Sequence, residues 1–241
     1  MRNGTCRYSD SIVNRTNIVS SRGGDSAVSV SINEPDSMEK YRHAFETNDF
    51  PTCESYLRSM PKLIHLEDED LETLLFAACR SGTQELMQSL INHGATLNHR
   101  NIIGNTPLHV AVASDRLDIV KLLVRAGADT NARNEFGESP LRRSTVTGNL
   151  SVVCELLESS ANPNLQDCDG ESPLHWACFG GSPDLIRFLM DAGANPLLDD
   201  HERLSPLEWA RTNVISSIVS IIENHSGVRI PKYETIDEAD S

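Results

Sequence analysis

A short phrase recurs along this chain at a fixed spacing. It reads Gly104-Asn105-Thr106-Pro107-Leu108-His109, returns at 137–141 and 170–175, and has a degraded copy at 204–207. One place in the phrase always holds a hydroxyl side chain, at positions that are 33 apart each time: Thr73, Thr106, Ser139, Ser172 and Ser205. A fixed period of this length indicates stacked supersecondary units, each burying its apolar face against its neighbours. The sequence therefore predicts a repeat array rather than a domain built around a single core.

The phrase also carries the signals of a helix start. Thr106 or Ser172 can cap the helix, and the proline that follows suits its first turn, where no amide hydrogen is needed. Glycine stands at the expected end of this inner helix in three units, where a left-handed backbone is predicted: Gly82, Gly148 and Gly181. A second, outer helix follows, with apolar residues at helical spacing on one face.

The phrase, the Gly-Ala pairs that close the outer helices and the asparagines beyond them resemble the ankyrin repeat. The Gly-Ala pairs are Gly94-Ala95, Gly127-Ala128 and Gly193-Ala194. The resemblance covers about 38–224. It implies an all-α repeat solenoid in which each helix-turn-helix unit is joined to the next by a projecting β-hairpin finger that turns near Gly104, Gly137 and Gly170.

The same resemblance divides the chain into segments. Residues 1–37 are rich in serine and almost lack aromatic side chains, so a disordered tail is expected there. The other expected segments are a capping helix pair at 38–66, repeats at 67–98, 99–131, 132–164 and 165–197, a C-terminal cap at 198–224 and an acidic tail at 225–241. The whole array, 67–224 with its cap, is expected to be a monomer with disordered termini.

The net charge of −14 lies almost entirely on the repeats. Nucleic acid is therefore a poor partner, because phosphate contacts need a basic face. A protein with a basic or mixed apolar and basic surface is the better candidate. No apolar run has the length of a signal peptide or of a membrane span, and the six cysteines show no framework spacing, so a cytoplasmic or nuclear protein without membrane attachment is expected.

Catalytic, cofactor and metal sites are not predicted. His109 and His175 stand at one fixed place of the phrase, where the resemblance implies a hydrogen bond to backbone and to the nearby hydroxyl. No phosphate-binding loop or His-Glu-x-x-His motif occurs, and the cysteines and histidines lack ligand spacing. Arg142-Arg143-Ser144-Thr145 matches the preference of basic-directed kinases, but Ser144 and Thr145 fall at predicted buried places.

The resemblance implies that partners bind to the finger tips and to the exposed side of the inner helices, which line a concave groove. The residues carried over to these places are Ile102, Ile103, Glu135, Phe136, Glu138, Arg143, Glu171, Trp176, Phe179 and Trp209, with Val146 and Asp169 at equivalent places. Large apolar residues at such places indicate a contact surface. The alternative is that Trp176 and Trp209 only stack between inner helices.

The function that follows is a non-enzymatic adaptor or inhibitor. Two alternatives stay open: a regulatory subunit of an enzyme complex, of the kinase-inhibitor or ubiquitin-ligase adaptor type, and a reader of basic peptide tails. Asn131 also resembles the asparagines that an ankyrin-directed asparaginyl hydroxylase modifies, because Leu123 and Asp129 precede it at the preferred spacings. Asn98 and Asn164 have the leucine but lack the acid.

Overall fold

The computed structural model describes residues 43–44, 47, 49–212 and 216–226. The tail expected at 1–37 lies outside these residues, as does the tail expected at 225–241 apart from its first two residues, which belong to the last helix.

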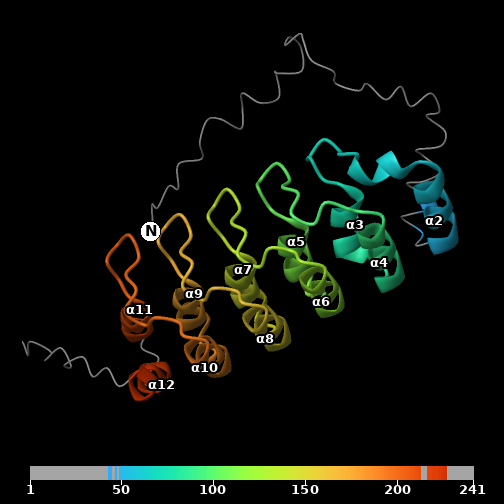
Figure 1. Cartoon of the computed structure of the whole chain (residues 1–241). Coiled ribbons are helices and arrows are strands. Elements are labelled where there is room, and N and C mark those ends of the chain that lie inside the picture. The colour runs from blue at the N-terminus through green and yellow to red at the C-terminus, as the bar shows by residue number, and fades with distance from the viewer. Residues whose placement is uncertain (1–42, 45–46, 48, 213–215, 227–241) are drawn as a thin grey trace, which may run out of the picture.

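Pairs of antiparallel helices stand side by side in one row (Figure 1). The inner helices are α3 (Leu74–Ser81), α5 (Pro107–Ala113), α7 (Pro140–Thr147), α9 (Pro173–Gly180) and α11 (Pro206–Thr212). The outer helices are α4 (Gln84–Asn92), α6 (Leu117–Arg125), α8 (Leu150–Glu158), α10 (Pro183–Asp191) and α12 (Ser216–Ser226). Each inner helix packs against the next inner helix and each outer helix against the next outer one, which confirms the predicted all-α repeat solenoid.

The N-terminal end of the row is covered by α2 (Phe50–Ser59) and by a short 3-10 helix, η1 (Pro61–His65). Asp49 caps α2 by accepting a hydrogen bond from the amide of Thr52. Cys53 and Leu57 are buried on the side that faces the array. The carboxylate of Glu54 accepts a hydrogen bond from the hydroxyl of Ser89, so α2 is fixed to the first outer helix.

The histidines of the repeated phrase hydrogen-bond to backbone and to the nearby hydroxyl, as expected, and they also join one repeat to the next. Nδ1 of His109 accepts the backbone amide of Thr106 at 3.1 Å, while Nε2 lies 3.0 Å from the carbonyl oxygen of Glu138 in the following repeat. Burial lowers the pKa of His109 to about 4. His175 makes the same contacts with Ser172 and with the carbonyl of Leu204. The neutral ring therefore donates through Nε2 and accepts through Nδ1.

The prediction of a left-handed backbone after each inner helix is confirmed at Gly148 and Gly181, whose φ values are 71° and 70°. It is wrong at Gly82, where φ is −69°. A Cβ atom at Gly82 would lie 2.8 Å from the Cα atom of Ala78. Glycine is needed at this position because the backbone passes close to the preceding helical turn, not because of its conformation.

The fingers are tight turns without β-strands in the described part of the chain. In the finger at 101–105, the amide of Asn101 donates to the carbonyl of Asn105, and the amide of Gly104 donates back to Asn101. The side chain at the base of every finger accepts two further backbone amides, and these residues recur with the period of the phrase: Asp68, Asn101, Asn134, Asp167 and Asp200. The described residues therefore contain five fingers, the first of them at 68–72, where the acidic run 67–70 occupies the hairpin position of the repeat.

Neighbouring fingers are linked through their backbones. The amide donors are Ile102, Glu135, Cys168 and His201, and their carbonyl acceptors are Asp70, Ile103, Phe136 and Asp169. The donor–acceptor distances are 2.9 to 3.1 Å. These bonds hold the tips of successive fingers in register.

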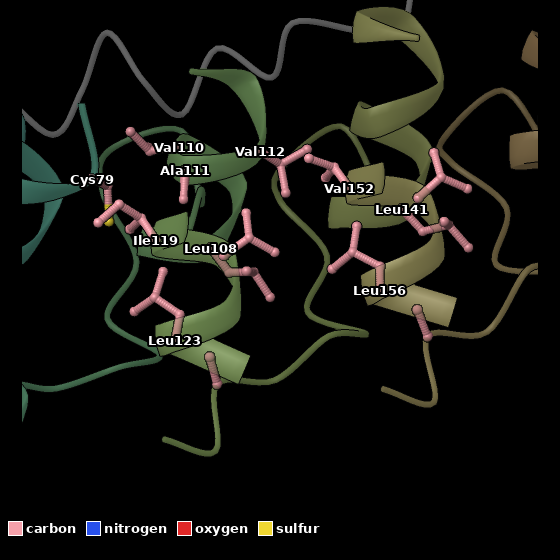
Figure 2. Close-up of a cluster of buried hydrophobic side chains, with 14 of the residues drawn as sticks. Cys79, Leu108, Val110, Ala111, Val112, Ile119, Leu123, Leu141, Val152 and Leu156 are labelled. Carbon is pink, nitrogen blue, oxygen red and sulfur yellow. The ribbon is translucent and has the colours of Figure 1, made fainter. Parts of the chain in front are cut away.

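A continuous apolar core runs between the two helix layers (Figure 2). Leu108 from α5 and Ile119 and Leu123 from α6 are fully buried together, and the next repeat supplies an equivalent group. Complete burial of each such side chain contributes about 1.5–3 kcal/mol. Ser144 and Thr145 are also buried, as predicted, and donate to carbonyls one turn back. None of the helices in the described residues has the length and apolarity that a bilayer crossing requires.

Candidate functional site

The fingers project from the inner-helix side of the row (Figure 1). We call this side the groove face; it comprises the finger tips 69–70, 102–103, 135–136, 168–169 and 201–202 with the solvent-facing side of α5, α7 and α9. Four large apolar residues of this face are exposed to solvent: Ile102, Phe136, Val146 and Phe179. Ile103 is half-buried beside them. The array therefore presents an apolar surface that its own packing leaves uncovered.

Val146 and Phe179 are the most exposed apolar side chains of this face, at 59% and 54%. They occupy equivalent places in successive repeats, on α7 and α9, and these helices pack directly against each other. Phe136, at 39% exposure, lies on the finger that precedes α7. The backbone hydrogen bond from the amide of Cys168 to the carbonyl of Phe136 fixes that finger tip.

An aromatic cluster supports Phe179 from beneath. The ring of Phe179 meets those of Trp176 and Trp209 edge-on, with centroids 6.0 and 6.3 Å away. The two tryptophan rings lie 6.4 Å apart, which is the contact between inner helices that the stacking alternative requires. Trp209 is only 6% exposed, and its Nε1 donates to Asp200 at 2.9 Å. Trp209 thus supports the face, whereas Phe179 forms part of its surface.

Arg142 is the residue of this region that the sequence analysis missed. The residue is 8% exposed, and its guanidinium carbon lies 4.0 Å from the ring centroid of Trp176. It pairs with Glu138 at 2.7 Å and with Asp167 at 3.3 Å. The signal was present in the sequence, because Arg142 stands one period before His175 and one period after His109, at the histidine place of the phrase.

Glu138 and Arg143 belong to the edge of the same network. Glu138 accepts from the side-chain amide of Asn134 at 3.0 Å and lies 3.6 Å from the guanidinium of Arg143. Glu138 is therefore engaged by its own chain, while Arg143 keeps part of its side chain in solvent. Glu135 is exposed at its finger tip and lies 3.7 Å from Arg100.

Three carboxylates gather at the fourth finger. The ligand atoms of Asp167, Asp169 and Glu171 all lie within 4.8 Å of one another. Burial, and then repulsion by Asp167 and Asp169, raise the pKa of Glu171 to about 7, although Arg142 opposes the shift. Both oxygens of Asp167 already accept protein donors, two amides and Arg142, so the trio is not a free ligand set for a metal ion.

Neither buried histidine is arranged for catalysis. Both ring nitrogens of His109 and of His175 are engaged by backbone or by the neighbouring hydroxyl. Burial lowers the pKa of each imidazole, and a general base needs a reachable substrate and a free nitrogen. Both imidazoles therefore serve to hold neighbouring repeats together.

Asn131 lies apart from the groove face, in the turn after α6, and is exposed. Its Oδ1 accepts the amide of Asn162 at 2.7 Å, and its Nδ2 donates to the carbonyl of Ser160 at 3.2 Å. Asn164 makes the same two bonds to the following turn. These asparagines therefore tie successive turns together.

Comparison with known proteins agrees with this architecture. A family model described as ankyrin repeats (3 copies) matches residues 42–134 and 141–230, which is more than half of the chain. A search of curated proteins gave no match to the sequence.

Proposed function

The chain belongs to the ankyrin-repeat family, whose repeats are generally protein–protein interaction modules, and from this premise we propose that it is a non-enzymatic adaptor or inhibitor that holds a protein partner on its groove face. The exposure of Phe136, Val146 and Phe179 carries the proposal. Exposed apolar side chains gathered on one face mark interaction sites, and aromatic residues at the centre of an interface supply much of its affinity.

The rigidity of this face supports the same reading. Phe179 rests on Trp176 and Trp209, and the finger bearing Phe136 is hydrogen-bonded to the next finger. A surface that is ordered before binding loses less conformational entropy when a partner arrives. The net charge of −14 favours a partner with basic as well as apolar groups and disfavours nucleic acid.

A reader of basic tails that encloses a cation in an aromatic cage is a weaker candidate. Arg142 already covers one side of the Trp176 ring, and Trp209 is buried. The role of a regulatory subunit in an enzyme complex is compatible with the same groove face and differs from an adaptor only in what the partner is.

Differential co-purification tests the proposal. Tagged full-length chain, wild type and Phe136→Ala/Phe179→Ala, is recovered from cells with its bound proteins, which are quantified by mass spectrometry. We expect a set of proteins retained by the wild type and reduced at least roughly tenfold with the double variant, which corresponds to about 1.4 kcal/mol.

Phe188→Ala is the matched control, because Phe188 is a phenylalanine with a similar exposure, 41%, but lies on the outer helix α10. It should retain the same proteins as the wild type, and circular dichroism should show that all three chains are folded at the temperature of the experiment. Equal retention by the double variant, or loss with Phe188→Ala, would show that the groove face is not the binding surface.

A further inference from the structure

The acidic residues of the fingers differ in whether a basic side chain of the same chain pairs with them. Glu72 pairs with Arg80, Glu135 lies near Arg100 and Glu138 pairs with Arg142. Among the described residues, no ion pair or hydrogen-bond donor engages the carboxylates of Asp169, Glu171 or Glu202, on the last two fingers. Apart from the attraction between Glu171 and Arg142, the negative charge at this end of the face has no cationic partner in the described residues.

This charge is connected to the exposed ring of Phe179 through a chain of side-chain contacts. Arg142 contacts Asp167 of the carboxylate group and the ring of Trp176, and Trp176 in turn meets Phe179. The finger carrying Asp169 and Glu171 leads directly into α9, the helix that carries Phe179. The carboxylates of Asp169 and Glu171 and the exposed apolar side chains of Phe179 and Val146 therefore belong to a single region of the face.

The carboxylates repel one another in the free protein. The carboxylate oxygens of Asp167, Asp169 and Glu171 lie within 4.8 Å of one another. Glu171 is half-buried, so its charged form is disfavoured both by lost hydration and by repulsion from Asp167 and Asp169. A cation brought by a partner would relieve this repulsion and form charge-assisted hydrogen bonds. The methylene stem of lysine or arginine would at the same time cover apolar surface.

We propose that the partner places a lysine or arginine side chain against Asp169 and Glu171 and lays the apolar residues beside it on Phe179 and Val146. The occupant of this docking surface is thus a protein segment in which a cationic residue stands among apolar ones, and the charge complementarity of the face selects it. The inference rests on the proposed function, since it names the chemistry of a partner bound to the same face.

Selection from a library of short random peptides displayed on phage tests this chemistry with the full-length chain. The wild type should enrich peptides that carry lysine or arginine next to leucine or an aromatic residue. Asp169→Asn/Glu171→Gln should lose the enrichment of basic residues. Glu69→Gln/Asp70→Asn is the matched control: it removes the same charge from the first finger tip, where the equivalent inner-helix place holds Arg80 instead of phenylalanine, and should select like the wild type.

A selected arginine peptide and its citrulline analogue, which has the same shape without the charge, are then compared by fluorescence polarisation. The analogue should bind the wild type at least roughly tenfold more weakly, and the two peptides should bind Asp169→Asn/Glu171→Gln about equally.

The outcomes separate the two proposals. Peptides enriched in apolar residues alone, or basic enrichment that survives in Asp169→Asn/Glu171→Gln, would overturn the cationic docking but leave the groove face in place. Peptides that bind Val146→Ala/Phe179→Ala as well as the wild type would overturn the groove face itself, and recovery of no peptides would count against both.

Discussion

The guanidinium of Arg142 lies 4.0 Å from the centre of the Trp176 ring, so a cation of one repeat covers an aromatic ring of the next. At the same place of the phrase, His109 and His175 connect their own helix start to the following finger through one carbonyl. Arg142 instead connects to the following repeat through Asp167 and Trp176. The junction after Arg142 is therefore stabilised by ion pairing and stacking, whereas the junctions after His109 and His175 use a hydrogen bond from a neutral imidazole.

Replacing Arg142 should therefore destabilise the array strongly. Arg142→Met leaves Asp167 buried without its cation, and removing one partner of a buried pair costs about 3–5 kcal/mol. Urea unfolding followed by circular dichroism measures the change. Arg187→Met removes an arginine from an exposed pair with Asp184 and should cost at most about 0.5 kcal/mol, and a loss for Arg142→Met no larger than this would contradict the assignment.

The hydroxyls of Thr73 and Thr106 should contribute differently to the stability of the fold, although they hold the same place of the phrase. Thr106 Oγ1 lies 2.9 Å from Nδ1 of His109, whereas Phe76 replaces the histidine beside Thr73 and leaves its buried hydroxyl unpaired. Thr106→Val should cost about 1 kcal/mol, as for a lost helix cap. Thr73→Val should be neutral or stabilising, because it removes an unsatisfied polar group. Equal losses in thermal unfolding would refute this difference.

Stability should respond to the charge of Glu171. Its pKa is raised to about 7 in the folded chain from an ordinary value of 4.5, so between these values the folded state holds the proton that the unfolded state has released. Protonated Glu171 therefore does not destabilise the fold at low pH, whereas its ionisation destabilises the folded chain as pH rises through about 7. Glu171→Gln should melt above the wild type at pH 8, with the difference fading below about pH 4.5. A constant difference across this range would rule out the shift.

The backbone at Ser160 should be strained. Its φ is 66°, and the equivalent places of neighbouring repeats hold Gly127 and Gly193, with φ values of 96° and 86° and open space for a Cβ atom. Ser160→Gly should stabilise the chain by about 1 kcal/mol, and Gly127→Ser should destabilise it by a similar amount, because the left-handed region disfavours side chains. Changes of the same sign in both variants would speak against this account.

Asn131 remains the asparagine that we propose as the site of hydroxylation. Peptide mass spectrometry of the chain recovered from cells should show the mass of one added oxygen at Asn131 in preference to Asn98 and Asn164. In the structure, Asp129 accepts the amide of Asn131, and its carboxylate is the feature that Asn98 and Asn164 lack. Asp129→Ala should reduce the modification, and modification of Asn98 with Asn131 untouched would exclude the proposal.

The fixed period of the phrase was sufficient to predict the solenoid, because the apolar, proline and glycine places recur in register with the helices they form. It also placed His109, His175, Ser144 and Thr145 in their observed surroundings. It failed at Gly82, where a close approach to Ala78 changes the backbone, since no local pattern reports the distance between two turns.

The candidate site was harder to predict, because its character depends on contacts between repeats. The sequence identified Phe136 and Phe179 as surface places, but the burial of Trp209 and the partial burial of Glu138 depend on what lies opposite them in the neighbouring unit. Arg142 was treated as part of a local basic run, although its register with the histidines held the needed information. Departures from the repeat pattern were therefore the most informative residues.

The link between fingers has a mechanical consequence. In the described array, the backbones of adjacent finger tips share one hydrogen bond per junction, so each tip is linked directly only to its two neighbours. Small rotations at successive junctions add along the row, so together they would change the separation of its two ends by more than any single junction does. Two neighbouring finger tips are thus fixed closely to each other, while the spacing of tips that lie far apart in the row is fixed less closely, because it depends on every junction between them.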